Sequence, residues 1–176
     1  MTSVLEWLRA ARSAPSPGRG DTDTVRRIVN ELDKLDPDRA RYLAAFAYVL
    51  SRVAGADLHI SDVETGTMVE LVQRLGHLSE AQAVLAVEIA KSQQRLVGGT
   101  ENFLVTREFR EIASDDQRKD LLHCLFAVAA ADAAISADED AQLWQIAGEL
   151  GFSRPEFIDV RLAYSDKRTV LRRDGT

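Results

Sequence analysis

The sequence of 176 residues contains a single cysteine, Cys124, so one chain cannot form an internal disulfide. Because disulfides belong mainly to oxidising compartments, this scarcity favours a reducing environment, and we expect the protein to be cytoplasmic. No apolar run approaches the roughly 20 residues that a membrane-spanning helix needs. Glu6 interrupts the apolar residues near the start of the chain, so we expect no secretory signal either.

Recognisable catalytic and zinc-binding motifs are also absent. The sequence has no G-x-S-x-G nucleophile turn, no phosphate-binding P-loop and no G-x-G-x-x-G dinucleotide fingerprint. Its histidines, His59, His77 and His123, show no paired spacing of zinc ligands with each other or with Cys124. We interpret Cys124 as a core residue, because apolar residues follow it. We therefore expect a protein that is not an enzyme.

Basic residues are scarce in the middle of the chain, which has a net charge of -6 overall. Residues 1–20 hold three arginines and one acidic residue, and residues 159–176 hold five basic and three acidic residues. Each end therefore has a net charge of +2, which leaves -10 for the middle. An acidic surface repels phosphate backbones and attracts metal ions or basic protein surfaces. We expect no nucleic-acid partner.

Strand patterns are missing, because no segment alternates apolar and polar residues over a sustained stretch. Apolar residues instead recur at spacings of three and four, which is typical of helices that bury one face. Gly76 and Gly151 each follow such a pattern, and glycine most easily takes the left-handed conformation of a helix C-terminal cap. We predict an all-α fold with helices near residues 3–12, 24–35, 43–54, 68–75, 79–96, 121–129, 143–150 and 155–164.

A twelve-residue stretch occurs twice in the chain, 75 positions apart, with seven identities. The first copy is residues 53–64, VAGADLHISDVE, and the second is residues 128–139, VAAADAAISADE. In each copy an apolar helix ends at an Asp, the chain turns through Ile-Ser, and a second helix opens with a Glu. We therefore predict a helical bundle of two repeats, residues 38–97 and 101–165, related by a pseudo-twofold axis.

The length of the chain fits a single domain with a sizeable core. We divide it into N-terminal helices and a linker in residues 1–37, the repeated helical domain in residues 38–165, and a basic C-terminal tail in residues 166–176. The predicted core residues lie on the apolar stripes of both repeats and are Phe46, Leu50, Leu71, Leu125, Phe126 and Ile146.

The two copies resemble the paired A-D-G-x-I-x-x-x-E motifs of the tellurite-resistance TerB-like family. The resemblance covers residues 38–165, and each copy is followed by a helix that ends in Leu-Gly. It implies an all-α fold of two helical repeats, acidic residues that bind a divalent metal, and a role in stress-associated systems or as a module beside other domains. The family's glycine is replaced by Leu58 in the first copy and by Ala133 in the second.

Each copy supplies one acidic pair, Asp57 with Glu64 and Asp132 with Glu139. In a structural interpretation, each Glu forms an S-x-x-E capping box with the serine three residues before it. In a functional interpretation, the two loops together offer four carboxylates to a divalent cation such as calcium or magnesium, which prefers oxygen ligands. One loop alone does not match the twelve-residue EF-hand loop. Both interpretations stay open, and these four residues are the predicted metal ligands.

The function that these patterns favour is a non-enzymatic domain that acts through protein partners and holds a divalent cation at the repeated loops. An alternative is a structural or membrane-peripheral adaptor that uses the apolar face of the N-terminal helix, residues 3–12, and binds no metal. We expect this helix to pack on the bundle instead, because it is short and only Arg9 and Arg12 flank its apolar face. The identity of the partner and the formation of a homo-oligomer stay open.

Overall fold

The computed structural model describes residues 19–53, 62–93, 102–131 and 134–165. Within these residues the chain forms helices joined by short turns and contains no sheet, which confirms the predicted all-α class. The predicted helix over residues 3–12 lies outside the described residues. The described helices are α2 (Arg19–Leu32), α3 (Pro37–Ser51), α4 (Asp62–Leu75), α5 (Glu80–Gln93), α6 (Asn102–Ile112), α7 (Asp115–Ala129), α8 (Ala137–Glu149) and α9 (Arg154–Leu162).

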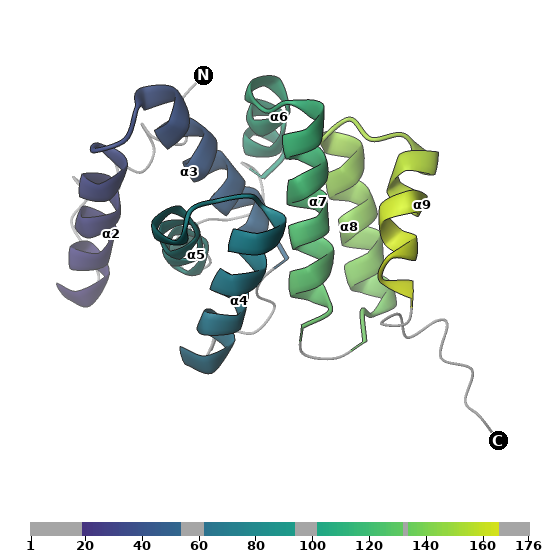
Figure 1. Cartoon of the computed structure of the whole chain (residues 1–176), viewed down its shortest axis with the longest axis horizontal. Coiled ribbons are helices and arrows are strands. Elements are labelled where there is room, and N and C mark those ends of the chain that lie inside the picture. Colours follow the sequence, from purple (N-terminus) through teal and green to yellow (C-terminus); the bar gives the residue numbers. More distant parts are fainter. Residues whose placement is uncertain (1–18, 54–61, 94–101, 132–133, 166–176) are drawn as a thin grey trace.

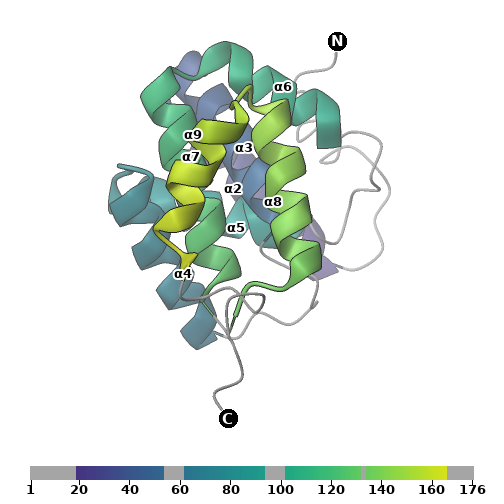
Figure 2. The same ribbon diagram turned by 90° about the vertical axis from the view of Figure 1, so that its right-hand side faces the viewer.

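Helix α3 lies at the centre of the molecule, where it packs against α5, α6 and α7 (Figure 1). Helix α5 also packs against α2 and α4, and α4 in turn contacts α7. Helices α7, α8 and α9 run roughly alongside one another on the other side of the molecule (Figures 1 and 2). None of the helices in the described part of the chain combines the length and apolar character needed to cross a bilayer.

The buried apolar residues of α2 to α9 form one continuous core. Phe46, Leu50, Leu125, Phe126 and Ile146 are all fully buried, as predicted. The prediction for Leu71 was wrong, because its side chain is only partly buried. On α4 the buried residues are Met68 and Val72, four positions apart, and Leu71 lies at the edge of the stripe that they define.

Four helices begin at the residues that helix N-termini prefer. Asp36 caps α3 by accepting hydrogen bonds from the backbone N–H groups of residues 38 and 39, with Pro37 in the first helical position. Helices α7, α8 and α9 each begin with a capping box, in which Ser114, Ser136 and Ser153 pair with the residue three positions later. These caps satisfy backbone donors that would otherwise lack partners and fix where each helix starts.

Helices α4 and α8 are each followed by a residue with a left-handed backbone, but the type of that residue differs. Gly151 follows α8 with a φ of 88°, as predicted, and the next N–H bonds back to the carbonyl of Ala147. After α4 the left-handed residue is His77, with a φ of 50°, so the prediction for Gly76 was wrong. Gly76 is needed for space instead, because a Cβ there would lie 2.6 Å from the carbonyl oxygen of Val72 and 3.1 Å from the ring of Phe46.

Helix α6, which the sequence did not single out, brings Phe109 into the core beside Phe46 and Tyr42. The two repeats also pack differently, since α5 lies against three helices whereas α9 packs mainly on α7. Ring contacts of Phe157 with Phe126 on α7 and with Trp144 on α8 hold α9 in place. The pseudo-twofold relation between the repeats stays a prediction.

His123 on α7 links the end of α9 to the bundle, because its carbonyl accepts a hydrogen bond of 3.1 Å from the Tyr164 hydroxyl. The Tyr164 ring also stacks on Phe126, with 5.3 Å between ring centroids. Burial lowers the pKa of His123, and the positive charge of Lys119 lowers it further, while Asp120 acts in the opposite direction. The folded protein therefore favours the neutral form of this histidine.

Replacing His123 with Gln is expected to make the fold less sensitive to acid. Because the pKa of His123 is lower in the folded than in the unfolded chain, its stabilising contribution is complete above the unfolded value of about 6.5. That contribution is lost as the pH falls from there toward the lower folded pKa. Urea unfolding at about pH 7.5 and about pH 5 should show a smaller loss of unfolding free energy in His123→Gln than in the parent. Equal losses in the two proteins would contradict this account.

Candidate functional site at the two acidic loops

Two of the predicted metal ligands lie in segments that we name the first acidic loop (residues 54–61, between α3 and α4) and the second acidic loop (residues 130–136, between α7 and α8). The other two follow these loops in the first turns of α4 and α8. Asp57 and Asp132 lie outside the described residues. Glu64 belongs to the first turn of α4, and its side chain is outside what the structure describes. Glu139, in the first turn of α8, is the one predicted ligand whose side chain is described.

Glu139 is held in place by Ser136, the N-cap of α8. Its Oε2 atom accepts hydrogen bonds from the Ser136 N–H at 2.7 Å and from the Ser136 hydroxyl at 2.8 Å. The Ser136 oxygen in turn accepts from the Glu139 N–H at 3.2 Å. The capping-box interpretation is therefore confirmed for the second copy. Within the described residues the other oxygen of Glu139, Oε1, has no hydrogen-bond partner, so capping and cation binding are compatible.

The neighbouring acidic residues of α8 are used differently. Asp140 accepts hydrogen bonds from the guanidinium of Arg161 on α9, with 2.9 Å between Arg161 Nε and Asp140 Oδ1. Both side chains of this ion pair are partly buried, so Asp140 helps to attach α9 to α8. Asp138 is exposed to solvent beside Glu139. Carboxylates in the first turn of a helix are stabilised by its dipole, which explains why three of them are tolerated together.

The described residues contain no group of three or more His, Cys, Asp or Glu side chains placed to share a metal ion. Three of the four predicted ligand side chains lie outside those residues. Metal binding by Asp57, Glu64, Asp132 and Glu139 therefore stays a prediction.

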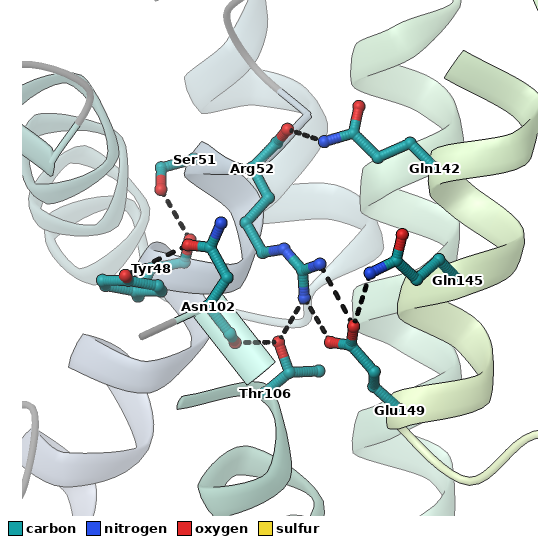
Figure 3. Close-up of polar contacts among 8 residues, drawn as sticks. All are labelled: Tyr48, Ser51, Arg52, Asn102, Thr106, Gln142, Gln145 and Glu149. Carbon is teal, nitrogen blue, oxygen red and sulfur yellow. Dashed lines mark hydrogen bonds and ion pairs between the residues drawn. The ribbon is translucent and has the colours of Figure 1, made fainter. Parts of the chain in front are cut away.

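A buried polar cluster lies where the end of α3 meets α6 and α8 (Figure 3). The guanidinium of Arg52, the C-cap residue of α3, forms an ion pair with Glu149 at the end of α8. The two side chains are only 6% and 8% exposed, so water contributes little to their solvation. Arg52 also donates a hydrogen bond of 2.7 Å to the hydroxyl of Thr106 on α6, which donates to the carbonyl of Asn102.

Glu149 is kept ionised by its partners. Burial on its own raises the pKa of this carboxyl, but the hydrogen bonds and charge of Arg52 and a hydrogen bond from Gln145 outweigh burial and lower the pKa below its usual range. The guanidinium is less completely satisfied than the carboxylate, because Arg52 Nε is buried and has no hydrogen-bond partner among the residues that the structure describes. A buried donor without a partner costs about 1 to 3 kcal/mol.

The main chain of Arg52 is also held by α8. Gln142 Nε2 donates a hydrogen bond of 2.6 Å to the Arg52 carbonyl oxygen, as Figure 3 shows. Gln142 lies one helical turn after Glu139, and Glu149 lies two turns after Gln142 on the same face of α8. Arg52, which caps the end of α3 just before the first acidic loop, is therefore bonded to α8, the helix that follows the second acidic loop.

Sequence reasoning missed Arg52, Thr106, Gln142 and Glu149. Arg52 and Glu149 are 97 positions apart, and neither belongs to a motif that would pair them. The two copies of the repeat are 75 positions apart, so the counterpart of Glu149 in the first copy is Arg74. Arg74 is exposed, so the repeat does not point to the cluster either. The one usable signal was a charged residue inside an otherwise apolar stripe at the end of α3.

Cys124 has no chemical role in this arrangement. It is fully buried, and burial raises the pKa of its thiol to about 12, with a smaller contribution from the negative charge of Asp120. The thiolate, which is the reactive form, is therefore not populated at neutral pH. This supports the interpretation of Cys124 as a core residue.

A family model described as "Tellurite resistance protein TerB" matches residues 42–162, which include both acidic loops and helices α4 to α9. No curated protein matches the chain, and no solved structure matches it.

Proposed function

We propose that this chain, which belongs to the tellurite resistance protein TerB family, is a stress-associated domain that works without catalysis. In this proposal it acts through contacts with other proteins and holds a divalent cation at its two acidic loops. Family membership rests on a match that spans more than half of the chain and includes both loops. Metal binding and protein contact are our inference from the residues at those loops.

The observation that carries the cation proposal is the state of Glu139. Its Oε2 is fixed by two hydrogen bonds from Ser136, which leaves Oε1 oriented and without a partner among the described residues. A carboxylate held in this way loses little side-chain entropy when it binds a cation. Calcium and magnesium prefer oxygen ligands and need six or more, so one loop is insufficient. Asp132 from the same copy and the duplicated Asp57 and Glu64 supply the remaining carboxylates in this proposal.

Contact with a protein partner is supported by the surface of α8 and α9. Trp144 on α8 and Leu162 on α9 stay 41% and 63% exposed. Large apolar and aromatic side chains are enriched at protein interfaces. The acidic middle of the chain favours a partner with a basic surface.

Changing Glu139 to Gln separates the capping role from the cation role. Gln also completes a capping box, so without cation the variant should unfold at nearly the parent temperature. In the parent, calcium, magnesium or manganese at ten times its dissociation constant should add about 1.4 kcal/mol of unfolding free energy. This corresponds to a rise in melting temperature of about 3 to 6 °C for a chain of this size, measured by calorimetry. The rise should disappear in Glu139→Gln and in Asp132→Asn.

The matched control is Asp159→Asn, which removes an exposed carboxylate on α9 outside both loops and should leave the cation response unchanged. A parent that shows neither a thermal shift nor a heat of binding with millimolar divalent cations would overturn the cation proposal. We expect weak binding, because Leu58 and Ala133 stand where the family has glycine. Unlike glycine, a residue with a side chain disfavours a backbone with positive φ.

A further inference from the structure

Three large apolar side chains lie exposed on the last two helices. They are Trp144 on α8 and Ile158 and Leu162 on α9, with exposed fractions of 41%, 37% and 63%. Smaller residues that carry no polar side chain lie exposed beside them on the same helices. We name the surface that these residues form the α8–α9 face, and its members are Ala141, Trp144, Gly148, Pro155, Ile158 and Leu162.

The members of the face are three and four positions apart on each helix, so they form one stripe along α8 and one along α9. The rings of Trp144 and Phe157 lie 5.0 Å apart between centroids, and Asp140 pairs with Arg161. The later residue of α8 therefore contacts the earlier residue of α9, which makes the two helices antiparallel. Both helices lie side by side at the front of Figure 2, and their exposed stripes fall on the same side of the pair.

Gly148 leaves open space in the middle of this face. A Cβ built at this position would have no atom from elsewhere in the described part of the chain within 4 Å. Glycine inside a helix is destabilising relative to alanine, and the packing of α8 gives no reason for it here. A glycine on a helix surface does allow the backbone of another element to come close. The face is therefore open to close approach from outside.

The two helices that form the face are acidic. Residues 137–162 hold six acidic and two basic residues, which gives a net charge of -4. Asp138 and Asp159 are exposed at the outer edges of the face, each within one helical turn of one of its members. Of the basic residues, Arg161 is paired with Asp140, and Arg154 is the first residue of α9. The apolar stripes therefore lie between exposed carboxylates.

This charge favours one kind of occupant. An acidic surface repels the anionic headgroups of a membrane, and a twofold axis through the face would bring the acidic edges of two copies together. The apolar stripe of an amphipathic helix has the spacing of the two exposed stripes, and basic flanks would complement the carboxylates. We propose that the α8–α9 face binds an amphipathic helix of a partner protein whose apolar stripe is flanked by lysine or arginine. This rests on the protein contacts of the proposed function and is independent of the cation.

The probe for this proposal is a synthetic peptide of leucine and lysine, about 18 residues long, with its leucines on one helical face. One control peptide has glutamate in place of every lysine, and the other has glutamine in place of every leucine. In an NMR titration of the full chain, the leucine–lysine peptide should shift the amide resonances of α8 and α9 and the indole N–H resonance of Trp144. Neither control peptide should do so at the same concentration. Equal binding of either control would contradict the proposal.

Replacing Gly148 with Gln tests the face without removing any contact within the chain. The added side chain has room and favours the helix, so stability should not fall. It should nevertheless weaken binding of the leucine–lysine peptide at least about tenfold, because it keeps the peptide away from α8. The matched control is Gly66→Gln on α4, where a Cβ also meets nothing within 4 Å, and it should bind like the parent.

A second matched pair tests the apolar contact itself. Leu162→Ser should weaken binding about tenfold, because an apolar side chain is lost from the face. Leu104→Ser, which changes a leucine on α6 that is 50% exposed, should leave binding unchanged. Equal effects of the two variants in either pair would overturn the assignment to this face.

The remaining outcomes separate this proposal from the proposed function. If the peptide binds and shifts resonances of other helices only, the face is not the docking site, whereas contact with a partner protein stands. If the peptide does not bind at all, the proposal fails and protein contact loses its support, while the cation response is still decided by its own assay. Self-association of the chain, or binding to anionic vesicles, that Leu162→Ser abolishes would assign the face to a second copy or to a membrane and would also overturn the proposal.

Discussion

Truncating Phe46 to alanine is expected to lower the free energy of unfolding by about 3 to 5 kcal/mol, measured by urea or guanidinium denaturation. Phe46 is fully buried on α3, and its ring lies 6.1 Å from the rings of both Tyr42 and Phe109. Removing it leaves a cavity between α3, α6 and the turn that follows α4, and Gly76 in that turn offers no side chain to fill it. The loss is a large share of the 5 to 15 kcal/mol typical of a domain.

A surface aromatic on a neighbouring helix is the control for this experiment. Phe103 on α6 is 50% exposed, so truncating it to alanine removes less buried apolar area. We expect this variant to lose at most about 1 kcal/mol of unfolding free energy. If Phe46→Ala were as mild as Phe103→Ala, the central position of α3 in the core would be wrong.

The fold class and the core were predictable because the apolar residues recur with helical spacing. Leu43, Leu50, Leu121 and Leu125 recur in this way on α3 and α7, and all of them are fully buried. Spacing identifies the middle of a buried stripe reliably, since residues three and four apart share one face. It is less reliable at the margin, which is why Leu71 was wrongly placed in the core.

The ends of helices were predictable only in part. Ser-x-x-Glu and Ser-x-x-Gln signals begin α7, α8 and α9, and the sequence shows all three patterns even though only the one at Ser136 was identified. After α4 the choice between Gly76 and His77 depended on tertiary packing. Gly76 fills a place with no room for a Cβ, while the left-handed turn falls on His77, whose ring pairs with Asp120 on α7 at 2.9 Å.

At the candidate site, the acidic loops were predictable from the sequence, whereas the contacts between distant segments were not. The internal duplication pointed to the acidic loops, because repeated residues need only a comparison of the chain with itself. The contacts of Arg52 with Gln142 and Glu149 join segments that are 90 and 97 positions apart. No local pattern encodes such a pairing, so only the packing of α8 against the end of α3 reveals it.

Replacing Glu149 with Leu is expected to lower the free energy of unfolding by about 3 to 5 kcal/mol. The guanidinium of Arg52 is only 6% exposed, and without Glu149 its charge would lie in the interior, where Thr106 is the one remaining side-chain acceptor among the described residues. The double variant Arg52→Met with Glu149→Leu removes both charges and fills the space with apolar groups. It should regain most of the lost stability, because the desolvation cost disappears together with the ion pair.

Denaturant unfolding of the parent, the single variant and the double variant measures this difference. An exposed pair provides the comparison, since Arg26 and Asp23 are 56% and 75% exposed and Asp23→Ala should change stability by at most about 0.5 kcal/mol. A double variant as unstable as Glu149→Leu would show that the cluster stabilises the fold through its own attraction. Recovery in the double variant would leave the fixing of α3 against α8 as the role of the pair, a role that the bond from Gln142 to the Arg52 carbonyl shares without any charge.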